Sequence, residues 1–217
     1  MNRKGPVRRL PRLDDEELTE LDSLDDEDDR TSALVTGDFT GADFSDLTLR
    51  ESRVTGATLT GSHLLRATFI DCLVADSDLS GAVLGGCQFE RVEFQHCRLS
   101  GVQAQGTRFT DVAMLDCKID GGNFRMTVWE RSELCDSNLV ECDFYGARLP
   151  GSRIHGCDLS NVEFSKCDLA GSRLQRSHLE GIRGGDSLRG VTIGSDQVIP
   201  AALALFASIG IAVDDND

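Results

Sequence analysis

The sequence predicts an all-β protein: a β-helix in which the chain turns a corner every five residues, followed by a short C-terminal α-helix. Three observations predict it. Apolar residues recur at every fifth position from Leu34 to Leu179, 30 in a row without an insertion, and Ala104 is the one small member. A small residue stands two positions before most of them. Gly, Asp or Asn stands two positions after 20 of the 30.

The five-residue period indicates which side chains face inward. It fits neither an α-helix, with a period of 3.6, nor a flat strand, with a period of 2. Residues two apart in an extended backbone point to the same side, so the large apolar residue, called the centre below, and the small residue before it both point inward. Gly, Asp and Asn tolerate the left-handed conformations that a corner requires. The remaining positions are mostly polar and are expected to face water.

The aromatic residues favour four sides per coil. Nine of the ten phenylalanines are centres. A coil of four repeats would stack seven of these nine, together with the tryptophan, in two columns: Phe69, Phe89, Phe109 and Trp129 in one, and Phe44, Phe124, Phe144 and Phe164 in the other.

Repeats such as Ala42-Asp43-Phe44-Ser45-Asp46 and Cys157-Asp158-Leu159-Ser160-Asn161 resemble those of the pentapeptide-repeat family. The resemblance extends over the whole run of repeats and implies a right-handed quadrilateral β-helix, a solenoid with four repeats per coil. We therefore expect three parts: a charged, disordered N-terminal tail over 1–31, the β-helix over 32–183, and a C-terminal cap with a helix over 184–217.

The cysteines and histidines suggest no chemistry. Seven of the eight cysteines occupy the small inward position, where a free cysteine behaves as a small hydrophobe: Cys72, Cys87, Cys97, Cys117, Cys142, Cys157 and Cys167. Cys135 points outward and is the thiol expected to react with reagents. The four histidines are scattered over outward positions, and no spacing suggests a zinc site. We expect neither a catalytic site nor a metal or cofactor, and hence no enzyme.

The N-terminal segment changes sign along its length. Basic residues come first, and the stretch from Asp14 to Asp29 is mostly acidic. A solvated, disordered tail is favoured for such a composition. Alternatively, four leucines could line one face of a short helix that forms a lid on the first coil, or the segment could be an acidic arm for a basic partner: Leu13, Leu18, Leu21 and Leu24.

The C-terminal segment predicts a helix that does more than close the rod. Ser195 and Asp196 provide an N-cap, an apolar run follows, and Gly210 provides the stop, after which Ile211–Val213 reads as a short strand. One face of the helix can cover the last coil, and the surplus apolar surface predicts a homodimer with Ile199, Leu203 and Phe206 as contacts. This tail resembles that of the MfpA branch of the family, in which a helix pairs two rods end to end.

The charge limits the possible partners. A net charge of −15 and a pI near 4.6 argue against binding nucleic acid through its phosphates. The sequence has no secretory signal and no apolar run long enough to span a bilayer, so a cytoplasmic protein without membrane contact is expected. The repeats from 34 to 183 contain 21 acidic and 15 basic residues, so they carry only part of this net charge.

Resemblance to the MfpA and Qnr branch of the family implies a specific function. Its members are acidic dimeric rods that imitate duplex DNA and bind DNA gyrase or topoisomerase IV, which inhibits the enzyme or protects it from quinolone antibiotics. On four-sided numbering, the side through Phe39, Leu59 and Leu79 has the most uniform charge. Its candidate partner-binding residues are Asp78, Asp120, Glu141, Asp158 and Glu180. Two alternatives stay open: these charges serve only solubility, or the rod is a scaffold for an unrelated protein partner.

Overall fold

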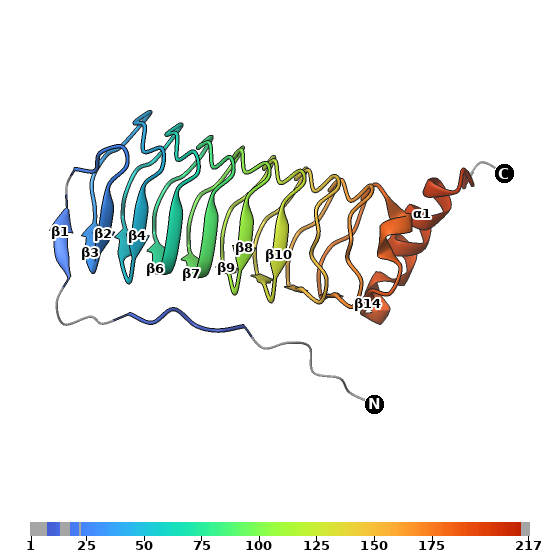
Figure 1. Cartoon of the computed structure of the whole chain (residues 1–217). Helices are drawn as coiled ribbons and strands as arrows, with labels where there is room; N and C mark the ends of the chain where they lie inside the picture. Colours follow the sequence, from blue (N-terminus) through green and yellow to red (C-terminus); the bar gives the residue numbers. More distant parts are fainter. Residues whose placement is uncertain (1–7, 14–17, 22, 214–217) are drawn as a thin grey trace.

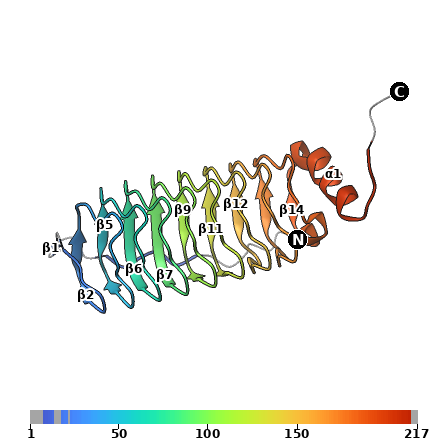
Figure 2. The same cartoon turned by 90° about the horizontal axis from the view of Figure 1, so that it is seen from above.

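The computed structural model describes residues 8–13, 18–21 and 23–213, and shows a rod of stacked coils with a helix at one end (Figure 1). All the strands belong to one sheet of parallel neighbours. The predicted all-β β-helix is confirmed. Seen from above, successive coils lie side by side along the whole rod, and the helix α1 (Val198–Ser208) packs against the last of them (Figure 2).

The rod has four sides, numbered here in chain order by their centres. Side 1 contains Leu49, Phe69 and Trp129; side 2 contains Val54, Phe94 and Leu134; side 3 contains Phe39, Leu59 and Leu179; side 4 contains Phe44, Leu64 and Phe164. Sides 3 and 4 consist of isolated bridges, such as Asp38 with Thr58 and Asp43 with His63.

Regular strands form side 2 and side 1 as far as β10, after which isolated bridges continue side 1. On side 1 lie β2 (Asp29–Thr31), β4 (Thr48–Arg50), β8 (Arg108–Thr110) and β10 (Val128–Glu130). On side 2 lie β1 (Thr19–Leu21), β3 (Ala33–Val35), β5 (Arg53–Thr55), β9 (Ala113–Leu115), β11 (Glu133–Cys135), β12 (Arg153–His155), β13 (Arg173–Gln175) and β14 (Thr192–Ile193). Two longer strands continue around the corner from side 1 to side 2: β6 (Thr68–Ala75) and β7 (Gln88–Gln95).

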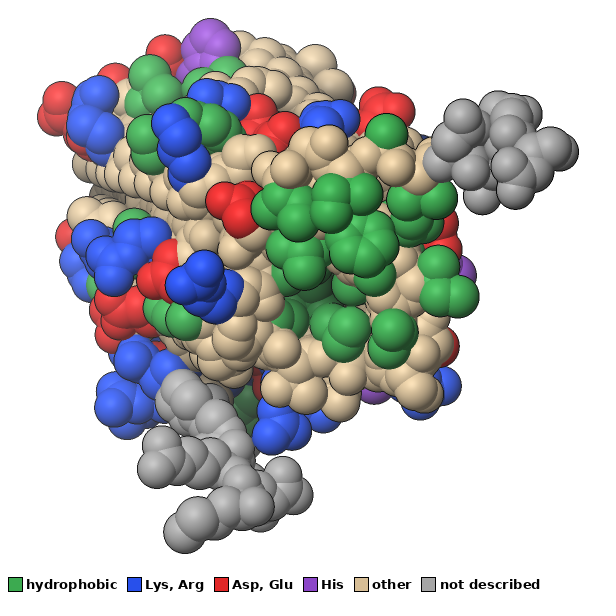
Figure 3. All heavy atoms as spheres, turned by 90° about the vertical axis from the view of Figure 1, so that its right-hand side faces the viewer, with side chains coloured by type: hydrophobic (Ala, Val, Ile, Leu, Met, Phe, Trp, Pro, Cys, Tyr) green, Lys and Arg blue, Asp and Glu red, His purple; other side chains and the backbone are tan. Residues whose placement is uncertain are grey.

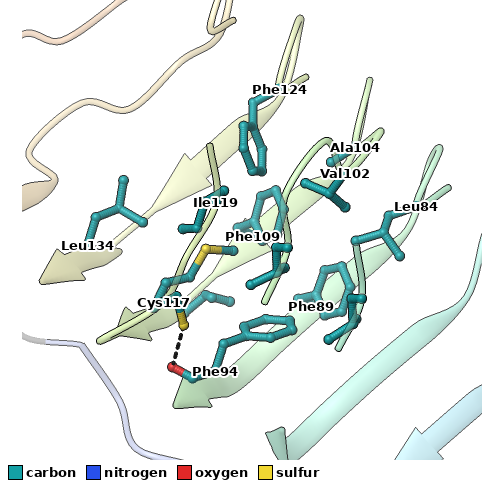
Figure 4. Close-up of a cluster of buried hydrophobic side chains, with 14 of the residues drawn as sticks. Leu84, Phe89, Phe94, Val102, Ala104, Phe109, Cys117, Ile119, Phe124 and Leu134 are labelled. Atoms are coloured by element: carbon teal, nitrogen blue, oxygen red, sulfur yellow. Dashed lines mark hydrogen bonds between the residues drawn. The ribbon is translucent and has the colours of Figure 1, made fainter. Parts of the chain in front are cut away.

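The register confirms a coil of four repeats. Phe69 pairs with Phe89, Phe89 with Phe109, and Phe109 with Trp129. Their rings stack with centroids 5.0, 5.3 and 3.8 Å apart. A second stack runs through Phe124, Phe144 and Phe164 on side 4. Large apolar side chains thus fill the rod from all four sides, as Figure 4 shows for the middle coils.

The inward cysteines are buried and free, as predicted from the repeat, and Cys135 is partly exposed. Thiols in this position donate hydrogen bonds to main-chain oxygens, as Cys117 does to the carbonyl of Phe94 at 3.6 Å (Figure 4). The four histidines lie on the outside.

The start of the repeat differs by one position from the prediction. Val35, not Leu34, is the inward centre: Val35 is 1 % exposed, whereas Leu34 is partly exposed. Val35 pairs with Val54, whereas a full coil would place its partner one residue later in the chain. Asp38, just after it, bridges to Thr58 at the full spacing of one coil. The first corner is therefore one residue short, and Gly37 accommodates it with a φ of 112° that favours glycine.

Two stretches of the described N-terminal segment form strands rather than a disordered tail or a helix, while residues 8–13 belong to neither a strand nor a helix. In β1, Glu20 pairs with Leu34, and in β2, Arg30 pairs with Leu49. Leu24, between them, is buried in the end of the core. Both strands cover edges that the first coil would otherwise leave unpaired, so strands rather than the suggested helix close this end of the rod. The expectation for 1–7, 14–17 and Asp22 lies outside the described residues.

The C-terminal cap begins with two short 3-10 helices, Gly185–Leu188 and Ser195–Gln197, on either side of β14. Gln197, rather than Ser195 or Asp196, fixes the start of α1: its buried side chain accepts a hydrogen bond from the amide of Gly194 and donates one to the carbonyl of Ser177. Gly210 ends the helix as predicted, with a φ of 78°.

The predicted strand over 211–213 does not form: these residues follow α1, are exposed and pair with no strand of the sheet. Within the described residues, no helix combines the length and the apolar character needed to cross a membrane.

Candidate partner-binding surface

All five predicted partner-binding residues lie on side 3, but they do not form one continuous row. The residues that precede the centres are bridged in the order Asp38, Thr58, Asp78, Arg98, Lys118, Asn138, Asp158, His178. Arg98 and Lys118 therefore separate Asp78 from the other four. Those four lie on successive coils toward the C-terminal end of the rod, linked by main-chain hydrogen bonds between neighbouring coils: Asp120, Glu141, Asp158 and Glu180.

Local hydrogen bonds hold several of these carboxylates in place. Asp158 accepts hydrogen bonds from the amide and the hydroxyl of Ser160, at 3.0 and 2.6 Å, and Asp78 accepts one from the amide of Ser80. Asp120 accepts a hydrogen bond from the hydroxyl of Ser100 and lies 3.8 Å from the ammonium group of Lys118. The charges of Asp78, Asp120 and Asp158 are therefore held in fixed positions, whereas Glu141 and Glu180 are exposed side chains.

Sequence reasoning missed three aspartates at the corner between sides 2 and 3. Asp76, Asp116 and Asp136 adopt left-handed backbone conformations and are exposed. His96 stands in the same column, with its ring nitrogens 3.5 Å from Asp76 and 4.0 Å from Asp116. The three aspartates are separated by whole numbers of coils, and this regularity could have revealed them. They were missed because each corner residue was assigned only to the side that precedes it.

The acidic surface, as defined here, is side 3 together with this corner. It carries nine acidic residues against three basic ones: Asp38, Asp76, Asp78, Asp116, Asp120, Asp136, Glu141, Asp158 and Glu180 against Arg98, Lys118 and Arg176. Side 1, opposite, has mixed charges that largely cancel, because Arg91 binds Asp71 and Glu90, and Arg131 binds Asp111 and lies 3.7 Å from Glu130. The negative charge of the rod is therefore concentrated on one side.

The C-terminal end presents an apolar surface. The residues predicted as dimer contacts all lie on α1 and are exposed, Ile199 by 72 %, Leu203 by 46 % and Phe206 by 38 %. Figure 3, which views this end, shows apolar side chains gathered around a hollow. The helix packs through small residues instead, since Ala201 and Ala204 are buried, and a Cβ on Gly185 would lie 2.3 Å from the carbonyl oxygen of Ala204.

The described residues contain no group of three His, Cys, Asp or Glu side chains placed to hold a metal ion.

Comparison with known proteins places the fold in a family. A model for pentapeptide repeat regions matches residues 87–161, and a model for eight-copy pentapeptide repeats matches 38–73 and 142–181. No curated protein sequence matches the chain.

Among solved structures, two trypsin-treated variants of QnrB1, described as a plasmid-mediated fluoroquinolone resistance protein, align at 22 % identity. Their TM-scores are 0.56 and 0.58. Each alignment covers 90 % of this chain, and the two cover 96 % and 94 % of the respective QnrB1 chains. A pentapeptide-repeat protein of the Arabidopsis thaliana thylakoid lumen aligns at 18 % identity over 42 % of this chain and 64 % of its own, with a TM-score of 0.41. The repeat register, the four-sided coil and the matched models together establish that the chain belongs to the pentapeptide-repeat family.

Proposed function

We propose that this protein is a non-catalytic rod whose acidic surface occupies the DNA-binding surface of a type II topoisomerase, DNA gyrase or topoisomerase IV. The observation that supports the proposal is the concentration of nine acidic residues on one side of a rigid rod. A basic surface that accommodates duplex DNA attracts such a rod through complementary charge. Because the main chain of every coil is hydrogen-bonded to its neighbours, little conformational entropy is lost on binding.

The charge density sets the expected strength. Duplex DNA carries one negative charge per about 1.7 Å of its axis. Coils rise by about 4.8 Å each, so the last four coils of the acidic surface, with a net charge of −4, carry one per about 5 Å. The rod is therefore a weaker polyanion than DNA, and its competition with DNA should be strongest at low salt, where screening is least.

We further propose that two copies pair end to end through α1. The exposed side chains of Ile199, Leu203 and Phe206 form a larger apolar surface than a single helix end usually leaves in water. Pairing would bury this surface and lengthen the rod. It would also place the acidic groups nearest the C-terminal end, Asp158 and Glu180, at the middle of the assembly.

The structural similarity to QnrB1 gives independent support, because QnrB1 is described as a fluoroquinolone resistance protein. Protection from these antibiotics is the outcome that the proposal predicts for this chain when it displaces DNA from a drug-poisoned topoisomerase. The alternative function, a scaffold for an unrelated protein, is favoured by Arg98 and Lys118, which interrupt the acidic surface.

The test uses the intact protein in a gyrase supercoiling assay, with and without a fluoroquinolone, at two salt concentrations. The proposal predicts that the protein inhibits supercoiling or reduces drug-induced DNA cleavage, and that the effect weakens as the salt concentration rises. Undiminished supercoiling and unchanged cleavage at a large molar excess would favour the scaffold function instead.

A further inference from the structure

The N-terminal residues 8–13, called the arm below, lie along the outside of the rod at the corner between sides 1 and 2. The amide of Arg12 donates a hydrogen bond to Asp71 at 3.0 Å, and the amide of Arg9 donates one to Asp111 at 3.1 Å. Arg8 reaches farther along side 2, where its guanidinium lies 2.7 Å from Glu93 and 3.7 Å from Glu133. Followed from Arg12 to Arg8, the arm thus runs along the outside of the coils toward the C-terminal end of the rod (Figure 1).

The spacing of the arm matches the spacing of the coils. Asp71 and Asp111 occupy equivalent corner positions two coils apart, or about 9.6 Å. Arg9 and Arg12 are three residues apart, and three residues of polyproline II chain span about 9.3 Å. Pro11, between them, has no amide hydrogen to leave unpaired and favours this extended conformation. Two amides separated by three residues therefore reach two carboxylates separated by two coils.

The socket for Arg8 is built into side 2. Glu93, Ala113 and Glu133 are neighbours in the sheet, because Ala113 pairs with both glutamates. All three occupy outward positions, yet Ala113 is completely buried. A small residue between two glutamates leaves room for a guanidinium, and the Arg8 side chain that fills this room is only 9 % exposed.

The fit of the arm is incomplete. Nε and Nη1 of Arg8 are buried without a hydrogen-bond acceptor. A buried donor that has lost its water without gaining a partner destabilises the bound state of the arm. The rod thus holds the arm through charge and a few well-placed hydrogen bonds, and a segment whose donors are all satisfied would bind better.

We infer that this groove, formed by Asp71, Glu93, Asp111, Ala113 and Glu133, is a recognition site for extended arginine-bearing segments of partner proteins, and that the arm occupies it as an intramolecular competitor. The ligand is defined by chemistry: a guanidinium for the two glutamates and main-chain amides three residues apart for the two aspartates. The groove lies on sides 1 and 2, so this binding is separate from that of the acidic surface.

The test combines an arm-deleted chain with a synthetic peptide. A chain lacking residues 2–13 should bind a labelled peptide of residues 1–13, measured by fluorescence anisotropy, and the intact chain should bind it at least about tenfold more weakly. In the deleted chain, Asp71→Asn with Asp111→Asn should weaken binding by about tenfold or more, whereas Asp158→Asn on side 3 should leave it unchanged. A scrambled peptide of the same composition serves as the control for net charge.

Two results would overturn the inference: equal binding of the scrambled peptide, or equal binding by the deleted and intact chains. A second measurement on the full chain does not depend on how the deleted chain folds. Ala113→Leu fills the socket, so trypsin should cleave after Arg9 and Arg12 several-fold faster than in the parent protein. Cleavage at the parent rate would show that the arm is not held in the socket.

Discussion

The guanidinium of Arg131 forms two parallel hydrogen bonds with the carboxylate of Asp111 on the preceding coil, Nε to Oδ1 at 2.8 Å and Nη2 to Oδ2 at 2.9 Å. The carboxylate is only 1 % exposed. Arg66 and Asp46 repeat this geometry at another corner, but their side chains are 61 % and 44 % exposed. The rod therefore contains matched buried and exposed versions of one ion pair.

The first prediction compares these two pairs. Asp111→Asn removes the buried carboxylate and leaves the partly exposed guanidinium of Arg131 without its counter-charge, which should lower the free energy of unfolding by about 1–3 kcal/mol. Asp46→Asn breaks the same pair geometry at an exposed corner and should lower the free energy of unfolding by clearly less, because solvent already screens this pair. Urea unfolding followed by circular dichroism measures both, and equal losses would show that burial of the corner does not set the strength of the pair.

The second prediction concerns pH. Burial raises the pKa of Asp111, but hydrogen bonds from Arg131 and the Arg9 amide, together with both positive charges, outweigh it and hold the pKa below its ordinary 3.8. The pKa of Asp71 is lowered in the same way, through Arg91 and Arg12. A lowered folded-state pKa adds stability that is complete above the unfolded value and is lost as the pH falls through the folded value.

The arm should therefore stabilise the rod at neutral pH and stop doing so in acid. The melting temperature of the intact chain should exceed that of the arm-deleted chain at pH 7, and the difference should begin to shrink as the pH falls below about 3.8, toward the lowered pKa values of Asp71 and Asp111. A difference that stays undiminished down to pH 2 would mean that these carboxylates do not hold the arm.

The third prediction tests the register at the first coil. Val35→Asp buries an unpaired carboxylate and should destabilise the N-terminal coils by about 2 kcal/mol or more. Leu34→Asp, one residue earlier, should change stability by less than about 0.5 kcal/mol, because this side chain is already partly in water. Thermal unfolding of the two variants distinguishes the two registers. An uninterrupted five-residue register would point Leu34 inward and make Leu34→Asp the more destabilising change.

The fourth prediction concerns assembly. Leu203→Glu with Phe206→Glu places two charges on the apolar surface of α1 and should convert a dimer into a monomer at micromolar concentration. Met126→Glu, on a more exposed apolar residue of the rod, should leave the dimer intact. Light scattering measures both. A parent protein that is itself monomeric at this concentration would contradict the proposed pairing.

Much of the fold follows from the sequence, because a repeat confines each residue to one of five positions. The inward centres, the buried cysteines and the stack through Trp129 were predictable on this basis. The one-residue shift at Val35 was not, since Leu34 and Val35 are both apolar and both extend the pattern. Which of them points inward depends on the short corner at Gly37, a backbone feature without its own sequence signal.

The surfaces were only partly predictable. The five acidic residues of side 3 and the exposed residues of α1 lie where the pattern placed them. The contacts of the arm were missed because a contact such as Arg9 with Asp111 joins residues 102 apart in sequence. No periodicity links a non-repetitive segment to the repeat that it crosses, although the alanine between Glu93 and Glu133 is a signal that could be sought in other rods.

The most direct test of the proposed function reverses one charge on each of two opposite sides. Asp158 on side 3 and Asp168 on side 1 each accept a hydrogen bond from the amide two residues later, so lysine at either position removes this bond, and at Asp158 it also removes the bond from the Ser160 hydroxyl. In a gyrase supercoiling assay, Asp158→Lys should raise the protein concentration needed for half-inhibition by about three- to tenfold, and Asp168→Lys should leave it unchanged. Equal inhibition by the two variants, whether at the level of the parent or below it, would contradict binding through the acidic surface.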